Sequence, residues 1–82
     1  MPSETLQVFR GAVQEVGSET FWADLFDETE PNNPQEFAEL LLSEVSKQDR
    51  PLLKPGAVFR WVISRETTAS GQVQLVSEIR FK

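Results

Sequence analysis

The sequence contains no cysteine, no histidine and no tyrosine. Without cysteine the chain can form no disulfide bond and no thiolate nucleophile, and with histidine absent as well the two usual zinc ligands are missing. Acid–base catalysis by an imidazole or a phenol is excluded in the same way. A chain of 82 residues also offers little material for a catalytic cleft. We therefore expect a protein that is not an enzyme and that holds no metal ion or other cofactor.

Long apolar runs are missing too. No stretch approaches the roughly eighteen apolar residues that a membrane-spanning helix needs. The segment Met1–Thr5 is polar and no run of about seven apolar residues follows it, so we expect no signal peptide. The lack of cysteine is compatible with a reducing compartment. The sequence therefore predicts a cytoplasmic protein that does not contact membranes.

The composition is that of a small folded domain. Hydrophobic residues make up 39% and charged residues 26% of the chain, as in globular rather than disordered proteins. The length allows one domain, covering residues 1–82. With no disulfide to help, the core must come from apolar side chains, and its aromatic candidates are Phe9, Phe21, Phe59, Trp61 and Phe81.

Four runs rich in strand-forming residues lie in two pairs, one near each end of the chain. A Gly-Ser turn separates the run Leu6–Val16 from Thr20–Phe26. The segment Thr67–Gly71 separates Ala57–Arg65 from Gln72–Phe81. Short runs of this kind bounded by glycine and serine are typical of β-hairpins, so we expect one hairpin at each end.

The alternation of apolar and polar residues assigns the faces of these strands, because strand side chains alternate with a period of two. The core faces are predicted to carry Phe59, Trp61 and Ile63 in the fourth strand and Val73, Leu75, Ile79 and Phe81 in the fifth. In the first strand the apolar phase changes around Gly11, which indicates a bulge or a sharp bend there.

The middle of the chain fits two templates. As a helix over residues 34–48, it would have Pro34 in its first turn and an apolar face that includes Phe37, Leu41 and Val45. As a strand over residues 36–42, it would alternate apolar and polar positions. Local propensity favours the helix. Closure of a small barrel favours the strand, because five strands close better than four.

A resemblance favours the strand. The stretches Leu42–Ser46 and Leu52–Phe59 resemble the end of the third strand and the start of the fourth in S-one-type RNA-binding OB domains. The run Asp49–Gly56 is also similar to small uncharacterised bacterial proteins with the same DR-x-LLKPG pattern. The resemblance covers about a quarter of the chain. It implies an all-β fold: a small five-stranded antiparallel OB-like barrel with a short helix before the fourth strand. The alternative is an α+β fold with two hairpins packed on one helix.

An acidic cluster begins within the second run and continues after it, and its members are Asp24, Asp27, Glu28 and Glu30. Hard cations take such oxygen ligands. The spacing does not match the calcium loop of EF-hands, however, because the required glycine and glutamate are absent. We therefore interpret this cluster as a solvated acidic loop and not as a metal site.

The chain is acidic overall but its two halves differ in charge. Residues 1–41 hold nine acidic residues and one basic residue, which gives −8, whereas residues 42–82 hold four and seven, which gives +3. The net charge of −5 disfavours unselective nucleic-acid binding. Within the basic half, Arg60 and Arg80 are the candidate nucleic-acid contacts. The alternative is that opposite charges on neighbouring strands pair within the molecule.

Three aromatic residues fall out of phase with the expected core: Trp22, Phe26 and Phe37. In OB folds the outer face of the second and third strands carries rings that stack on bases. The acidic residues nearby would repel phosphates and suit a protein partner with basic residues better. We therefore expect these rings to bind a protein, which includes a second copy of this chain. Single-stranded nucleic acid is the alternative partner, and burial of Trp22 under a loop would remove the surface.

Overall fold

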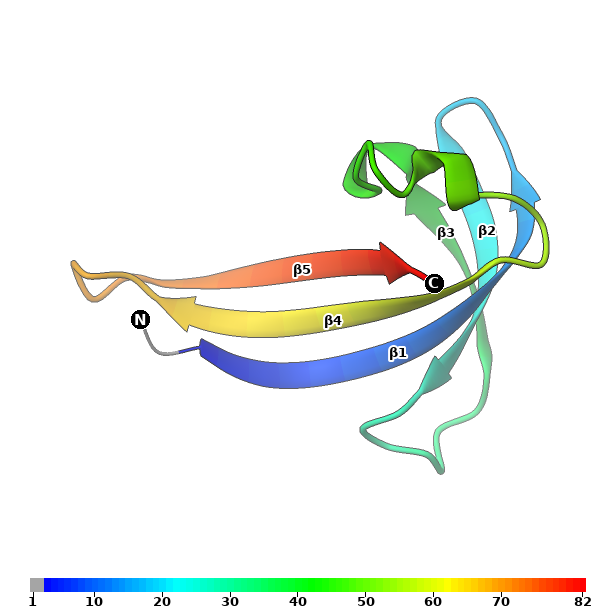
Figure 1. The fold of residues 1–82 in the computed structure, drawn as a ribbon. Coiled ribbons are helices and arrows are strands. Elements are labelled where there is room, and N and C mark those ends of the chain that lie inside the picture. The colour runs from blue at the N-terminus through cyan, green and yellow to red at the C-terminus, as the bar shows by residue number, and fades with distance from the viewer. Residues whose placement is uncertain (1–2) are drawn as a thin grey trace.

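The computed structural model describes residues 3–82, which form one antiparallel sheet of five strands (Figure 1). The strands are β1 (Ser3–Val16), β2 (Thr20–Asp27), β3 (Glu36–Leu41), β4 (Val58–Thr67) and β5 (Val73–Phe81), and their order in the sheet is β3-β2-β1-β4-β5. The helical segments in this part of the chain are two single 3₁₀ turns, η1 (Leu42–Glu44) and η2 (Arg50–Leu52). The all-β prediction with its two terminal hairpins is confirmed, and η2 stands where the short helix was expected.

The contested middle segment is a strand, so the alternative helix over residues 34–48 is wrong. Residues 36–41 pair with β2 from Thr20–Leu41 to Leu25–Glu36. This pairing buries Leu40 against the core. An isolated helix of this length is marginal in water, whereas a strand at the open edge of β2 gains a full ladder of hydrogen bonds. Tertiary pairing therefore overrides the local helix propensity.

The sheet curves strongly but, in contrast to the barrel expected from the sequence, it does not close, because β3 and β5 remain its two edge strands and do not pair with each other. In Figure 1, β2 and β3 stand steeply across the direction of β1, β4 and β5. The register of β1 shifts between Val13 and Glu15 on the β2 side and between Thr5 and Gln7 on the β4 side, and such bulges increase strand twist. An isolated parallel bridge from Val45 to Ile79 links the segment after β3 to the edge of β5.

Gly11 is not the site of a bulge, in contrast to the sequence-based expectation. It keeps regular pairing with Leu25 on one side and with Phe59 on the other. Glycine is required here for a different reason: a Cβ atom at this position would lie 2.0 Å from Cζ of Phe59 and would clash with its ring. The ring of Phe59, which is fully buried, therefore packs directly across the backbone of β1.

The core lies on the inner face of the curved sheet. Its buried members are Phe9, Val13, Phe21, Ala23, Leu25, Leu40, Val45, Phe59, Ile79 and Phe81. The rings of Phe21 and Phe59 meet edge to face at 5.8 Å, and those of Phe59 and Phe81 are 5.1 Å apart. The predicted core faces are confirmed near the body of the sheet.

Two residues that were expected in the core are exposed. Val73 is 61% and Leu75 is 70% accessible to solvent. They lie in the part of the β4–β5 hairpin that extends beyond β2 and β3, where no other element within residues 3–82 covers the inner face (Figure 1). The period-two pattern correctly predicted which face these side chains share. It could not predict that β2 and β3 do not extend far enough to cover that face.

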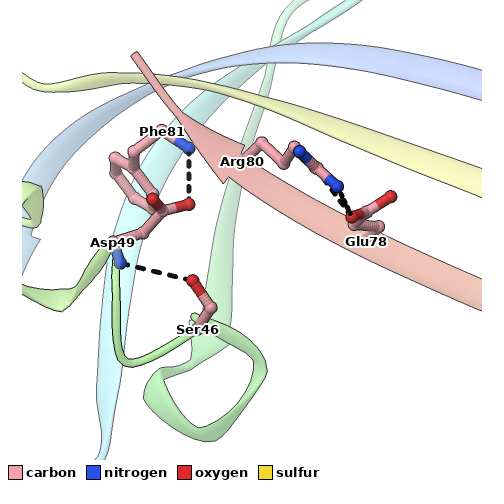
Figure 2. Close-up of polar contacts among 5 residues, drawn as sticks. All are labelled: Ser46, Asp49, Glu78, Arg80 and Phe81. Carbon is pink, nitrogen blue, oxygen red and sulfur yellow. Dashed lines mark hydrogen bonds and ion pairs between the residues drawn. The ribbon is translucent and has the colours of Figure 1, made fainter.

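The connection between β3 and β4 is attached to the end of β5 (Figure 2). The Oδ2 atom of Asp49 accepts a hydrogen bond from the backbone N–H of Phe81 at 3.1 Å. The hydroxyl oxygen of Ser46 in turn accepts from the N–H of Asp49 at 3.2 Å. The sequence suggested no role for Asp49, and the structure shows that its carboxylate satisfies an edge N–H that no strand pairs.

We predict that Gly11→Ala destabilises the domain strongly. The added methyl group must displace the ring of Phe59, and overpacking of this kind typically costs about 1–3 kcal/mol of the free energy of unfolding. Urea denaturation followed by tryptophan fluorescence measures this loss. Gly17→Ala is the control, because its Cβ would meet only the carbonyl oxygen of Thr20 at 3.2 Å. Equal stability of the wild type and Gly11→Ala would contradict the packing described here.

Candidate binding surface on the outer face

The outer face of the sheet, opposite the core, carries the three rings that the sequence placed outside the core. In β2 the buried residues Phe21, Ala23 and Leu25 alternate with half-buried positions that include Trp22 and Phe26. The expected outward orientation of these two rings is therefore observed. Phe37 in β3 is also on this face, opposite Asp24 of β2, and is 60% exposed. No loop in the described part of the chain buries Trp22 completely.

Trp22 and Phe37 form a stacked pair. Their ring centroids are 5.1 Å apart and their planes differ by 15°. Carboxylates flank the pair, because Glu39 lies opposite Trp22 and Asp24 lies opposite Phe37 in the β2–β3 ladder. The hydroxyl of Thr20 donates to Glu39 at 2.7 Å. This half of the outer face is thus an apolar platform with an acidic rim. We call the three rings Trp22, Phe26 and Phe37 the aromatic patch.

Three arginines cross the other half of the outer face in one line. Arg10 of β1 lies opposite Arg60 of β4, and Arg60 lies opposite Arg80 of β5. Phe26 of β2 continues the line, because it pairs with Arg10. Like charges directly opposite each other on neighbouring strands destabilise a sheet. This arginine row therefore costs stability and is a candidate for contact with an anionic group.

Few of these charges are neutralised within the molecule. The guanidinium carbon of Arg10 lies 5.1 Å from the ring centroid of Phe26, a cation–π contact. Arg80 pairs with Glu78 at 2.7 Å, but both side chains are exposed and such pairs contribute little. Arg60 makes no ion pair with any residue in the range 3–82.

Pairing between the acidic and basic halves of the chain is correspondingly limited. Within the described residues one ion pair joins the two halves, between Glu4 of β1 and Arg65 of β4. The alternative interpretation of the charge asymmetry, general pairing across the sheet, is therefore wrong for the arginine row. Arg60 and Arg80 lie together on the same face as the aromatic patch.

The acidic cluster is divided by the fold. Asp27 is buried, with 8% of its surface exposed, and organises the loop that follows β2. Its carboxylate accepts hydrogen bonds from the backbone N–H and hydroxyl of Thr29 at 3.0 and 2.6 Å and from the N–H of Glu30 at 3.0 Å. The side-chain amides of Gln7 and Asn33 also donate to it, each at 3.0 Å. Across residues 3–82 no group of three or more potential metal ligands comes together.

These hydrogen bonds hold the pKa of the Asp27 carboxyl far below its usual range. The hydrogen bond from the Thr29 side chain is the largest cause, and burial of the carboxylate opposes the shift. The organised loop also borders the outer face. Together with Arg10 and Phe26 it lines a shallow hollow of about 380 Å³ at the end of the arginine row.

Sequence reasoning missed Arg10 as a member of this surface. Its charge was visible, but its place opposite Arg60 depends on the register of β1 with β4, which contains a bulge. A bulge cannot be located from a single sequence, and a shift of one residue moves a side chain to the other face. The two rings of β2, by contrast, were correctly assigned from alternation alone.

Comparison of the chain with protein-family models, with curated proteins and with solved structures finds no match in any of the three. Within residues 3–82 no helix has the length and apolar character needed to cross a membrane. The interpretation of the outer face therefore rests on its own chemistry.

We predict that Asp27→Asn removes part of the acid sensitivity of the fold. The carboxyl pKa is lowered by folding, so its stabilising effect is fully present above the unfolded pKa of about 3.9 and is lost as the pH falls toward the folded pKa. The variant should be less stable at pH 7, and its stability should change less between about pH 5 and pH 2. Chemical denaturation at a series of pH values measures both effects.

Glu28→Gln is the matched control for this experiment, because Glu28 is exposed and follows Asp27 directly. It should leave the stability and its pH dependence close to those of the wild type. An Asp27→Asn variant with the acid dependence of the wild type would show that this carboxyl does not organise the loop.

Proposed function

We propose that this protein is a non-enzymatic interaction module that binds a protein partner through its outer face, with Trp22, Phe26 and Phe37 as the contact residues. One observation carries the proposal: the stacked Trp22–Phe37 pair lies on the outer face and outside the core, with Trp22 half-buried and Phe37 60% exposed. Aromatic side chains and arginine are enriched at protein interfaces and supply most of their hot spots.

The charge distribution supports a protein rather than a polyanion. The aromatic patch is flanked by Asp24 and Glu39, while the arginine row lies on the adjoining strands. A partner that covers both halves needs basic groups for one and acidic groups for the other, which proteins provide and a nucleic-acid backbone does not. No catalytic step is proposed, because the chain lacks the nucleophilic and imidazole side chains considered above and the Asp27 carboxylate is engaged in loop hydrogen bonds.

Single-stranded nucleic acid is the second candidate, favoured by the arginine row. In OB folds the face of the second and third strands binds oligonucleotides. The open five-stranded sheet, in which β1 pairs with both β2 and β4, is similar to that architecture and is consistent with the resemblance in the sequence. On this hypothesis Arg60 and Arg80, joined by Arg10, would contact phosphates while the rings stack on bases. The net charge of −5 and the acidic rim oppose it.

We predict that Trp22→Ala weakens binding to the protein partner by about 1–3 kcal/mol, because the ring is an anchor of the interface. Partners captured from an extract on the immobilised wild type would be identified and their affinities for each variant measured by calorimetry. Substituting Arg60 and Arg80 by alanine should leave the affinity largely intact, because both side chains are exposed and charges at an interface rim affect the association rate more than the affinity. Leu52→Ala is the control, because Leu52 is exposed in the η2 turn, outside the β-sheet. A Trp22→Ala variant that no longer folds would place the ring in the core and contradict the proposal.

We also predict negligible binding to random single-stranded RNA or DNA at near-physiological salt. Phosphate binding releases counterions, so a true interaction weakens with salt at a log–log slope of about −0.7 per phosphate contacted. Fluorescence anisotropy with a labelled oligonucleotide at several salt concentrations measures this. Micromolar, steeply salt-dependent binding that disappears when Arg10, Arg60 and Arg80 are replaced by alanine would establish the nucleic-acid alternative instead.

A further inference from the structure

The outer edge of β5 is open along the part of the strand that lies in the extended hairpin. At its other end this edge is covered, because Val45 forms a bridge with Ile79 and Asp49 accepts the N–H of Phe81. Between Val73 and Ser77, no described residue pairs with this edge, and Figure 1 shows no segment beside it. The stretch Val73–Ser77, called the open edge below, therefore has a row of unpaired backbone groups.

The hydrogen-bond pattern identifies which residues present these groups. In an antiparallel ladder, successive residues direct their N–H and C=O alternately to one neighbour and to the other. The N–H of Lys82 donates to Val58 of β4, whereas the N–H of Phe81 points away from β4 to Asp49. The even-numbered residues of β5 thus bond to β4. The odd-numbered ones, Val73, Leu75 and Ser77, direct their backbone groups outward.

The open edge lacks the usual protection against strand pairing. Soluble proteins protect such edges with lysine, proline or a bulge. The ladder between β4 and β5 runs without a register shift from Phe59–Phe81 to Thr67–Val73, and the stretch Val73–Ser77 contains neither lysine nor proline. The side chains of Val73 and Leu75 are among the most exposed apolar ones of the domain.

The other edge strand of the sheet is protected by charge. The N–H of Leu42 donates to the carbonyl of Glu19, so the even-numbered residues of β3 bond to β2. The odd-numbered residues direct their backbone N–H and C=O groups outward from the sheet edge. Glu39 stands in the middle of these outward positions. Antiparallel pairing of two copies of β3 about this centre would set Glu39 against Glu39, which is unfavourable. The two edges therefore differ in their capacity for self-pairing.

We propose that two copies of this chain pair through their open β5 edges, antiparallel, with the two-fold axis at Leu75. This register sets Leu75 against Leu75 and Val73 against Ser77, with about six hydrogen bonds between the outward backbone groups. It also sets Glu78 against Gln72, so no like charges meet. Pairing ends at Ser77, because Val45 already occupies the next outward residue, Ile79.

The register is supported by three separate features of the strand. It uses all three outward residues of the open edge, covers the exposed side chains of Val73 and Leu75 in both copies, and extends the sheet across the two-fold axis. The outer faces of the two copies then lie on the same side of the joined sheet. This dimer does not depend on the function proposed for the outer face, but it would present that face twice and raise its avidity for a partner with repeated sites.

Leu75→Pro tests the proposal directly. Because the N–H of Leu75 points outward, proline there removes no hydrogen bond to β4 but blocks pairing with a second copy. Sedimentation velocity over a range of concentrations should show a monomer–dimer equilibrium for the wild type and a monomer for the variant. A wild type that stays monomeric up to about 1 mM, or a dimer that persists in a folded Leu75→Pro variant, would overturn the proposal.

A charge-exchange experiment tests the register even if the proline variant does not fold. Leu75→Lys and Leu75→Glu should each be monomeric, because like charges would meet at the two-fold axis. An equimolar mixture of the two should form a heterodimer. Leu41→Lys is the matched control, since Leu41 is a similarly exposed leucine on the other edge strand, and it should leave the wild-type dimer intact. A mixture that stays monomeric would exclude the Leu75–Leu75 register.

Discussion

The packing of Phe59 against Gly11 is the contact on which the rest of the structure depends. β1 is the strand that pairs with β2 on one side and with β4 on the other, so it joins the two hairpins into one sheet. Gly11 pairs with Leu25 in one ladder and with Phe59 in the other. Because Gly11 has no side chain, the ring of Phe59 can lie across the strand. The rings of Phe21 and Phe81 then pack on Phe59 and complete the core.

The curvature around this contact determines what the outer face presents. Bulges on either side of Gly11 bend β1, and regular pairing between them aligns Phe26, Arg10, Arg60 and Arg80 across four strands. Aligned arginines repel one another and so do not stabilise the monomer, whereas the stacked Trp22–Phe37 pair stabilises the β2–β3 ladder but leaves the ring of Phe37 exposed. The repulsion and the exposed ring are both accounted for by the proposed partner, which would meet an acidic aromatic half and a basic half of one surface.

The same curvature leaves part of the molecule uncovered. β2 and β3 turn away from β4 and β5, so no other described strand or turn covers the inner face of the distal hairpin and Val73 and Leu75 remain exposed (Figure 1). The connection after β3 reaches the edge of β5 near its C-terminal end, at Val45 and Asp49. The two proposed associations use different surfaces of this open sheet, its outer face and its free edge, so one would not block the other.

The sequence by itself determined the all-β class, both hairpins, the inward faces near the body of the sheet and the outward orientation of Trp22 and Phe26. These features follow from turn residues and period-two alternation, which act over a few neighbouring residues. The strand over residues 36–41 was predicted from the resemblance and from barrel closure, against the local helix propensity, and its pairing with β2 confirms it. Only the tertiary structure decided that Arg10 joins Arg60 and Arg80 and that Leu75 is exposed. Each of these depends on long-range register or on which element covers a face, because pairing partners and bulges are set by contacts distant in sequence.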